Sequence, residues 1–148
     1  MKTKFNLLFL CTGNSCRSQM AEGWTRALKS DVITVYSAGT QPQELDPRAV
    51  AVMAEAGVDI SHHQSKHVNA FKDVDLDAVV TVCGHAHETC PYFPPRCKVV
   101  HVGFDDPPKM AKILAEKGAT ASEQLDCYRK IRDEIKAYVE DLPGSLTD

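Results

Sequence analysis

Four short apolar runs, rich in strand-forming residues, alternate along the chain with longer segments of helical periodicity. The runs cover residues 5–10, 32–39, 76–82 and 97–102. Strands that alternate with helices build a parallel sheet, because each connection crosses back over the sheet through a helix. The pattern therefore predicts a doubly wound, three-layer α/β/α fold with a four-stranded parallel sheet. Ligands of such folds bind at the carboxyl ends of the strands.

Apolar spacing and capping residues locate the helices between these runs. The first helix is predicted over residues 18–28, where apolar side chains recur at helical spacing. Asp46 followed by Pro47 indicates an N-cap with proline at the first helical position, and Gly57 ends that helix. An apolar stripe predicts the last helix over residues 122–142.

Length and composition limit the classes of protein that the chain can belong to. Its 148 residues suffice for one domain with a substantial core, and we expect residues 1–148 to form a single domain. A net charge of -3 argues against nucleic acid as the main partner, and no apolar run reaches the ~20 residues of a membrane span. The apolar part of the first ten residues is too short for a signal peptide, so we expect a cytoplasmic protein, and a monomer.

The segment "CTGNSCRS", residues 11–18, joins the first predicted strand to the first helix. A loop of small residues that enters a helix can turn its backbone N–H groups inward and bind an anion. Gly13 and Asn14 tolerate the left-handed conformations that such a loop needs, and Arg17 offers a planar fork for two oxygens of an oxyanion. The absence of a Gly-Lys-Ser/Thr ending excludes a Walker-type nucleotide loop. The predicted oxyanion-binding residues are Thr12, Gly13, Asn14, Ser15, Cys16 and Arg17.

Cys11 lies at the base of this predicted loop. In the positive field of the loop its thiolate is favoured, and Ser18 can donate a hydrogen bond to it. We therefore expect the pKa of Cys11 to fall well below about 8.5 and its thiolate to act as a nucleophile. The alternative is a buried structural cysteine beside a surface arginine.

The stretch "FLCTGNSCRSQMAEGW" resembles the low-molecular-weight protein tyrosine phosphatase superfamily, and its "SCRSQMAEG" part resembles the thioredoxin-coupled arsenate reductase branch. The likeness runs from about residue 4 to Asp106 and resumes over residues 129–135. A phosphatase of this superfamily usually has proline where this chain has Gln19. The resemblance implies the low-molecular-weight phosphatase fold and an arsenate reductase, with phosphate and sulfate as analogues of the substrate.

The resemblance also implies an acid in "VGFDDPP", residues 102–108. Asp106, immediately before Pro107, would protonate the oxygen that leaves the tetrahedral centre. Asp105 is the weaker candidate. Without Cys11 and Arg17, two aspartates before a proline would indicate only a turn.

A second pair of cysteines separates a reductase from a phosphatase. Cys83 ends the third predicted strand and so emerges at the same edge as Cys11. In the implied relay, Cys83 attacks the Cys11–arsenic adduct, arsenite leaves, and Cys90 then takes over the disulfide for thioredoxin. Cys83 and Cys90 are seven residues apart, too far for a disulfide across an intact helix, so we predict that residues 84–92 unwind on oxidation.

The same residues also allow other interpretations. Cys83, His85, His87 and Cys90 could ligate a metal, but their alternating spacing fits a helix poorly, and we expect no metal site and no cofactor. Cys97 and Cys127 are predicted to be structural, with the Cys16 thiol facing away from the anion. We predict a cytoplasmic arsenate reductase of arsenical detoxification with weak phosphatase activity. The alternatives are a low-molecular-weight protein tyrosine phosphatase and a thiol-based metal or redox sensor without turnover.

The chain departs from its relatives in two places. Some reductases of this family hold potassium with residues that would correspond to Asn14, Glu22 and Ser37, but the two remaining positions here are Gln64 and Lys66. We predict that the lysine ammonium takes the place of the cation. The segment 108–124 is also longer than in the family and is predicted to form an extra helical turn.

Overall fold

The computed structural model describes residues 4–84, 86, 91 and 93–147 of the 148-residue chain. The strands are β1 (Phe5–Cys11), β2 (Ile33–Gly39), β3 (Ala78–Thr81) and β4 (Lys98–His101). The helices are α1 (Arg17–Lys29), α2 (Pro47–Glu55), α4 (Pro107–Glu116) and α5 (Ala121–Glu140), with short 3-10 turns η1 (Val68–Phe71) and η2 (Gly144–Leu146). The four predicted strands are present within two residues at each end. The predictions for His85, His87 and Cys90 lie outside the described residues.

The sheet is parallel throughout, with the strand order β2-β1-β3-β4. Its central strand β1 carries the run Leu7–Leu10, which is fully buried because both faces of the sheet are covered there. In the register of β1 with β2, Cys11 lies beside Gly39. The nucleophile candidate is therefore the last residue of an inner strand whose final five residues are all buried.

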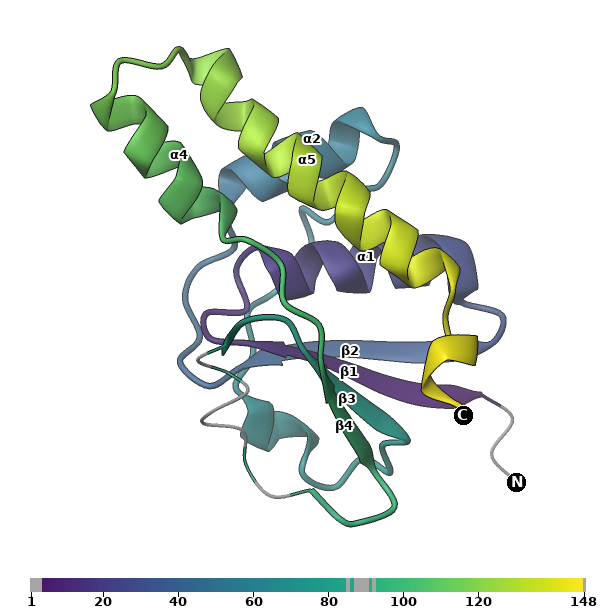
Figure 1. The fold of residues 1–148 in the computed structure, drawn as a ribbon. Helices are drawn as coiled ribbons and strands as arrows, with labels where there is room; N and C mark the ends of the chain where they lie inside the picture. The colour runs from purple at the N-terminus through teal and green to yellow at the C-terminus, as the bar shows by residue number, and fades with distance from the viewer. Residues whose placement is uncertain (1–3, 85, 87–90, 92, 148) are drawn as a thin grey trace.

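Helices α1, α2 and α5 lie on one face of the sheet, and η1 lies on the other (Figure 1). The apolar side of α1 packs on the sheet through Met20 and Ala21, and Trp24 Nε1 donates to the carbonyl of Arg132 in α5. This arrangement confirms the predicted α/β fold. The start of β1 and the turn η2 lie near each other at the amino edge of the sheet, away from the loops at the carboxyl edge (Figure 1).

The segment after β4 forms more helix than the single extra turn that the sequence predicted. Helix α4 has ten residues, begins with two prolines and packs along α5, with Ala111 buried between them. Helix α5 begins at Ala121 because Thr120 caps it, and Glu123 returns a bond to the Thr120 backbone. The pair α4–α5 extends beyond the sheet at its carboxyl edge (Figure 1).

The strand order creates a crevice at one point of the sheet. After β1 the chain adds β2 on one side of it, and later adds β3 on the other side. Crossover connections therefore leave the carboxyl ends of β1 and β3 in opposite directions, and this reversal is where such folds bind ligands. Cys11 ends β1 and Cys83 follows two residues after β3, so the topology places both cysteines at the crevice.

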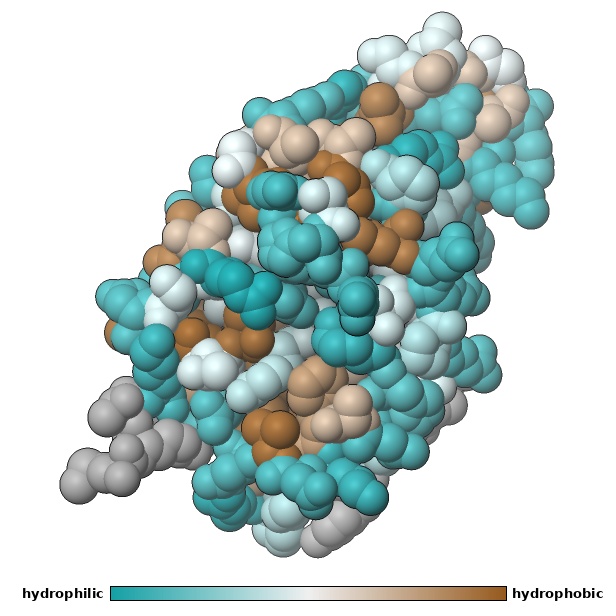
Figure 2. Space-filling view, turned by 180° about the vertical axis from the view of Figure 1, so that it is seen from behind, coloured by the Kyte–Doolittle hydropathy of each residue, from teal (hydrophilic) through white to brown (hydrophobic). Residues whose placement is uncertain are grey.

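Two surface observations bear on partners. Among the described residues, no helix has the length and apolar character needed to cross a membrane. On the face seen in Figure 2, apolar residues occur in small groups separated by polar ones rather than in one continuous patch. Scattered apolar residues of this kind are usual on the surface of monomeric proteins.

Candidate active site

A hollow of about 420 Å³ lies at the carboxyl edge of the sheet. It is lined by Cys11, Thr12, Gly13, Ser15, Cys16, Arg17, Gln43, Cys83, Asp106 and Pro108. The structure therefore brings together four of the predicted catalytic residues, namely Cys11, Arg17, Cys83 and Asp106. Asp105 does not line the hollow, which favours its neighbour as the acid.

The backbone of the anion loop, residues 11–16, is held from outside by the segment that follows β2. Four backbone N–H groups of this segment donate to loop carbonyls: Thr40 to Cys11 (3.2 Å), Gln41 to Thr12 (2.9 Å), Gln43 to Gly13 (2.8 Å) and Asp46 to Ser15 (2.9 Å). The remaining carbonyl, that of Asn14, accepts from the side chains of Gln19 and Ser65. Every carbonyl from Cys11 to Ser15 is therefore turned outward.

Outward carbonyls determine the direction of the loop N–H groups. In a planar trans peptide the C=O of one residue and the N–H of the next point in opposite directions. The Gly13–Asn14 peptide follows this rule, since its carbonyl is bound by Gln43 and its N–H donates to Cys11 Sγ at 3.1 Å. The same rule turns the N–H of Gly13 and of Cys16 inward. Together these groups form a concave set of donors that suits an oxyanion.

Gly39 permits this close approach of the two segments. A Cβ atom at this position would lie 2.5 Å from the carbonyl oxygen of Thr12 and 2.9 Å from the amide nitrogen of Asn14. Any larger residue would therefore push the loop away from the strand end. Sequence reasoning missed this contact, although a glycine that ends the strand next to Cys11 was a signal for it.

Asn14 is the conformational centre of the loop. It is fully buried and has a φ of 50°, so the predicted left-handed residue is Asn14, whereas Gly13 does not adopt a positive φ. Its Nδ2 donates to Ser18 Oγ (2.8 Å) and to Ser37 Oγ (3.0 Å). Its Oδ1 accepts from the backbone N–H of Lys66 (2.9 Å). The strained backbone is therefore fixed by bonds to three other segments.

Gln19, which stands where phosphatases of the family usually have proline, joins this network. Its side chain is fully buried, and Nε2 donates to the Asn14 carbonyl at 2.9 Å and to the Gln64 carbonyl at 3.1 Å. Its Oε1 accepts from His63 Nδ1 at 2.9 Å. Proline could make none of these bonds, so the loop here is supported from below by an amide.

The Cys11 thiol lies at the base of the hollow and is buried. Ser18 Oγ is 2.9 Å from its sulfur, so the predicted partner is in place. Burial nevertheless raises the pKa of Cys11 above its ordinary value, and the hydrogen bonds from Ser18 and Asn14 oppose that rise. The prediction of a strongly lowered pKa is therefore wrong for this arrangement. The sequence argument relied on the positive field of the loop and left out the cost of burial.

Arg17 is turned toward the acid loop. Its guanidinium donates to the Phe104 carbonyl at 2.9 Å and lies 3.7 Å from a carboxylate oxygen of Asp106. Asp106 is the N-cap of α4, but its side chain makes no capping bond. The carboxyl group therefore remains directed to the hollow and to Arg17 rather than to the helix end.

Cys83 is buried at the wall of the same hollow. Thr12 Oγ1 lies 3.2 Å from its sulfur, and the Ala86 N–H donates to that sulfur at 3.4 Å. Two hydrogen-bonding groups thus contact the second thiol. Among the described residues, no cluster of histidine, cysteine or carboxylate side chains has the geometry of a metal site.

The residues that correspond to a potassium site do not fit a cation. Lys66 Nζ donates to the Gln64 carbonyl at 2.6 Å and lies 4.0 Å from Glu22 Oε1. Ser37 donates to Glu22 Oε1 and Arg26 to Glu22 Oε2, each at 2.6 Å. The candidate oxygen ligands are thus already bound by donors of the protein, and the Lys66 ammonium lies among them.

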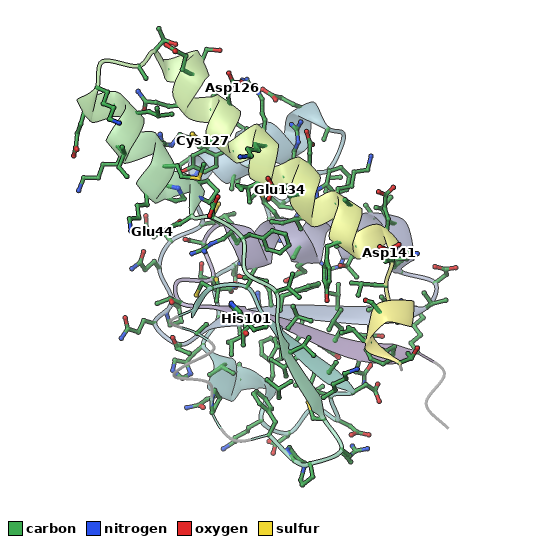
Figure 3. All side chains as sticks on the ribbon, in the orientation of Figure 1. Glu44, His101, Asp126, Cys127, Glu134 and Asp141 are labelled. Carbon is green, nitrogen blue, oxygen red and sulfur yellow. The ribbon has the colours of Figure 1, made fainter. Side chains whose placement is uncertain are left out.

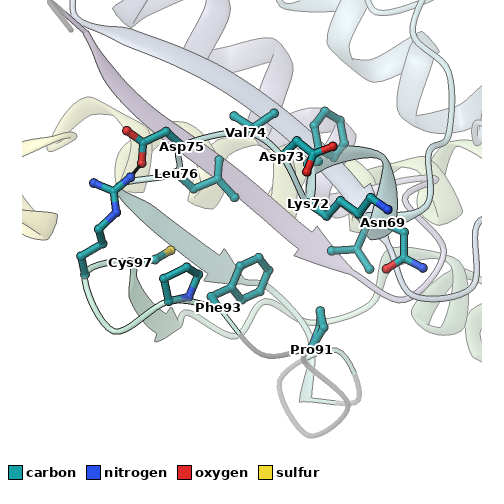
Figure 4. A pocket seen from close by; sticks show the side chains of 13 residues that line it. Asn69, Lys72, Asp73, Val74, Asp75, Leu76, Pro91, Phe93 and Cys97 are labelled. Atoms are coloured by element: carbon teal, nitrogen blue, oxygen red, sulfur yellow. Dashed lines mark ion pairs between the residues drawn. The ribbon is translucent and has the colours of Figure 1, made fainter. Parts of the chain in front are cut away.

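Cys97 and Cys127 do not line the hollow, whereas Cys16 does. Cys127 is a buried residue of α5 on the part of the molecule that carries α4 (Figure 3). Cys97 borders a different cavity of about 350 Å³ near η1, where Asp75 and Arg96 form an ion pair (Figure 4). That cavity contains no residue of the anion loop. Cys16 lines the hollow, and burial raises the pKa of its thiol well above the ordinary value.

Comparison with known proteins agrees with this geometry. The family model for low molecular weight phosphotyrosine protein phosphatases matches residues 6–147. An arsenate reductase of Bacillus licheniformis is 46% identical over 133 residues, which cover 90% of this chain and 91% of the relative. A solved structure of an arsenate reductase in the phosphate binding state is 31% identical, with a TM-score of 0.73 and coverage of 97% of this chain and 99% of that chain.

The fold is also shared with a thioredoxin-dependent arsenate reductase of Corynebacterium glutamicum. The TM-score is 0.72 at 23% identity, over 98% of this chain and 63% of that chain. The family match spans almost every described residue, from within β1 to η2. This chain therefore belongs to the low molecular weight phosphotyrosine protein phosphatase family, together with the arsenate reductase of Bacillus licheniformis.

Proposed function

We propose that this protein reduces arsenate to arsenite and that a thioredoxin-like dithiol protein regenerates it. The observation that carries the proposal is the presence of two thiols, Cys11 and Cys83, on the one hollow that the anion loop lines. A phosphatase needs only the first thiol. The names of the relatives support the same substrate.

In the first step the anion loop binds arsenate through its inward N–H groups and Arg17. The Cys11 thiolate attacks arsenic and forms a sulfur–arsenic bond. An oxygen leaves arsenic as water after Asp106 supplies a proton. Ser18, at 2.9 Å from the sulfur, stabilises the thiolate before the attack.

In the second step the electrons move to arsenic. The Cys83 thiolate attacks the Cys11 sulfur, a disulfide forms, and the electron pair of the sulfur–arsenic bond goes to arsenic. Arsenic is thereby reduced from the pentavalent to the trivalent state and leaves as arsenite, while the two thiols are oxidised. Thr12 supports this step, because its hydroxyl contacts the Cys83 sulfur at 3.2 Å.

In the third step the oxidation moves outward. The Cys90 thiolate attacks the Cys83 sulfur and releases Cys11 as a thiolate, and the dithiol partner then reduces the Cys83–Cys90 disulfide. Cys90 lies outside the described residues, so its part rests on the sequence. The unwinding of residues 84–92 on oxidation stays a prediction for the same reason.

The proposal also covers the cellular compartment and the oligomeric state. We assign the enzyme to the cytoplasm, where thioredoxin systems keep thiols reduced, and Cys11, Cys16, Cys83 and Cys127 are free thiols here. We also propose a monomer of one domain. The separated apolar groups on the face in Figure 2 support that oligomeric state.

Two activities measured on one set of variants test the proposal. Arsenite formation with thioredoxin, and with glutaredoxin as a second donor, is compared with phosphate release from an aryl phosphate. Cys83→Ser should abolish the first activity and retain the second, because the anion loop and Cys11 remain. Cys127→Ser, which removes a buried cysteine that does not line the hollow, should retain both. Arsenite formation by Cys83→Ser at the wild-type rate would refute the relay.

Cys90→Ser separates a relay of three cysteines from one of two. This variant should reduce one arsenate per molecule and then stop as a Cys11–Cys83 disulfide, which mass spectrometry of trapped thiols detects. Repeated turnover with thioredoxin would eliminate Cys90 from the mechanism. Stoichiometric bound metal without turnover would instead support a sensor.

A further inference from the structure

Asp46 connects three parts of the molecule at the back of the anion loop. Its backbone N–H donates to the Ser15 carbonyl at 2.9 Å. Its Oδ1 accepts from the Arg48 N–H at 2.9 Å and so caps α2. Its Oδ2 accepts from the Tyr128 hydroxyl of α5 at 2.7 Å. Both carboxylate oxygens and the amide of one residue are thus fixed, each by a different element.

The Tyr128 hydroxyl donates to Asp46, and its ring is part of the buried core. Its side chain is fully buried, and burial together with the Asp46 carboxylate raises its pKa far above the ordinary value, so the hydroxyl stays a donor. The Arg48 guanidinium lies over its ring, 5.0 Å from the centroid. A phenylalanine would fill the same apolar space on α5. The hydroxyl adds only the bond to Asp46.

The helix cap does not account for this bond. Capping α2 uses Oδ1, whereas Tyr128 binds the other carboxylate oxygen. With both oxygens bound, the Asp46 side chain is restrained, and this restrains the position of the residue whose N–H donates to Ser15. That N–H holds the Ser15 carbonyl outward and therefore the Cys16 N–H inward, toward the hollow.

We propose that Tyr128 is a positioning residue of the anion site: through Asp46 it fixes the Ser15–Cys16 peptide, so that the Cys16 N–H faces the bound oxyanion. The inference rests on the proposed function in one respect, namely that the loop of residues 11–16 receives the oxyanion. It extends the site from the loop to the last helix. It also assigns a purpose to the hydroxyl of a buried tyrosine in α5.

A double-mutant cycle on anion binding tests the inference. Tyr128→Phe removes the hydroxyl and keeps the ring, whereas Asp46→Ser keeps a helix cap and loses the reach to Tyr128. Each variant should weaken inorganic phosphate binding, measured by titration calorimetry, by about tenfold. The double variant should be no weaker than the worse single one, because both remove the same bond. Tyr138→Phe, another hydroxyl loss from α5, should bind phosphate like the wild type.

A second measurement separates positioning from loss of stability. The rate of Cys11 alkylation by iodoacetamide is followed against pH, and its profile should move to higher pH in Tyr128→Phe but stay in place in Tyr138→Phe. A lower melting temperature with unchanged phosphate affinity and an unchanged profile would overturn the inference, as would additive losses in the cycle. Failure of the wild type to bind phosphate would instead overturn the proposed function and remove the basis of the inference.

Discussion

The floor of the site and its rim hold their side chains in different ways. The floor consists of Cys11, Asn14 and Ser18, which are buried and hydrogen-bonded to one another. On the rim, Arg17 and Asp106 are 15% and 41% exposed and meet across 3.7 Å. The third rim residue, Cys83, is contacted by Thr12 and by one backbone N–H. The floor is therefore fixed before any ligand arrives, whereas the rim groups can change partners when an oxyanion enters.

This difference explains how one fold can serve two reactions. A preorganised floor supplies the nucleophile and the oxyanion donors, which phosphate-ester hydrolysis and arsenate reduction both require. The rim determines the fate of the covalent adduct, because an acid releases a leaving group and a second thiol accepts an oxidation. Changes to the floor or to Arg17 should therefore affect both activities, and a change to Cys83 should separate them.

The largest expected effect comes from the nucleophile itself. Cys11→Ser should lower arsenite formation and phosphate release together by at least about 10³-fold, since both begin with the same thiolate. Phosphate binding should persist, because the backbone donors and Arg17 remain. Activity assays and phosphate titration on the same preparation check this. Retention of either activity would identify a different nucleophile.

Arg17→Lys should have the next largest effect. A lysine ammonium cannot reproduce the two parallel bonds of the guanidinium, so arsenate affinity should fall about a hundredfold. Arg96→Lys, at the cavity near η1, is the matched control and should bind arsenate normally. Near-normal affinity of Arg17→Lys would remove this residue from the oxyanion site and leave oxyanion binding to the floor alone.

Asn14→Ala tests whether the floor is a structural unit. It removes the bonds to Ser18 and Ser37 and leaves alanine in a left-handed conformation, so unfolding free energy should fall by about 3 kcal/mol. Asn14→Gly should be less destabilised than Asn14→Ala by about 1 kcal/mol, because glycine adopts this backbone without strain. Urea unfolding measures both. Equal stabilities of the two variants would show that the backbone of Asn14 is not strained.

The sequence predicted the floor better than its supports. The sequence alone predicted the loop, the strand end at Cys11 and the donor Ser18, because the chemistry depends on these residue types and their order. The sequence did not predict the donors of residues 40–46, because these are backbone N–H groups, which almost any residue type supplies. The contact between the side chains of Gln19 and His63 was also missed, because these residues are 44 positions apart and only the fold brings them together. The pKa of Cys11 was misjudged because burial is a tertiary property.

A smaller effect, on the pH dependence of stability, is expected from His63, whose ring contacts Gln19 next to the floor. Burial lowers the pKa of this imidazole and Glu22 only partly opposes that shift, whereas an unfolded histidine titrates near about 6.5. Below that pH the unfolded chain binds a proton that the folded protein resists, so stability should fall as pH drops from 7 toward 5. His63→Gln should flatten this part of the stability curve, and His62→Gln, at the exposed neighbour, should not. If stability depends on pH in the same way in the wild type and in His63→Gln, another group is responsible for the loss of stability at low pH.

The smallest effect is expected from the alkali cation. The Lys66 ammonium binds the Gln64 carbonyl and lies 4.0 Å from Glu22 Oε1, so we predict that no further cation binds beside the floor. Replacing sodium by potassium at equal ionic strength should change the melting temperature by less than about 1 °C and leave turnover unchanged. Lys66→Gln should lose stability in sodium and recover part of it in potassium, because the carboxylate then lacks one of its positive neighbours. A large potassium gain in the wild type would show that the lysine does not replace the ion, and that the floor is incomplete without a ligand of its own.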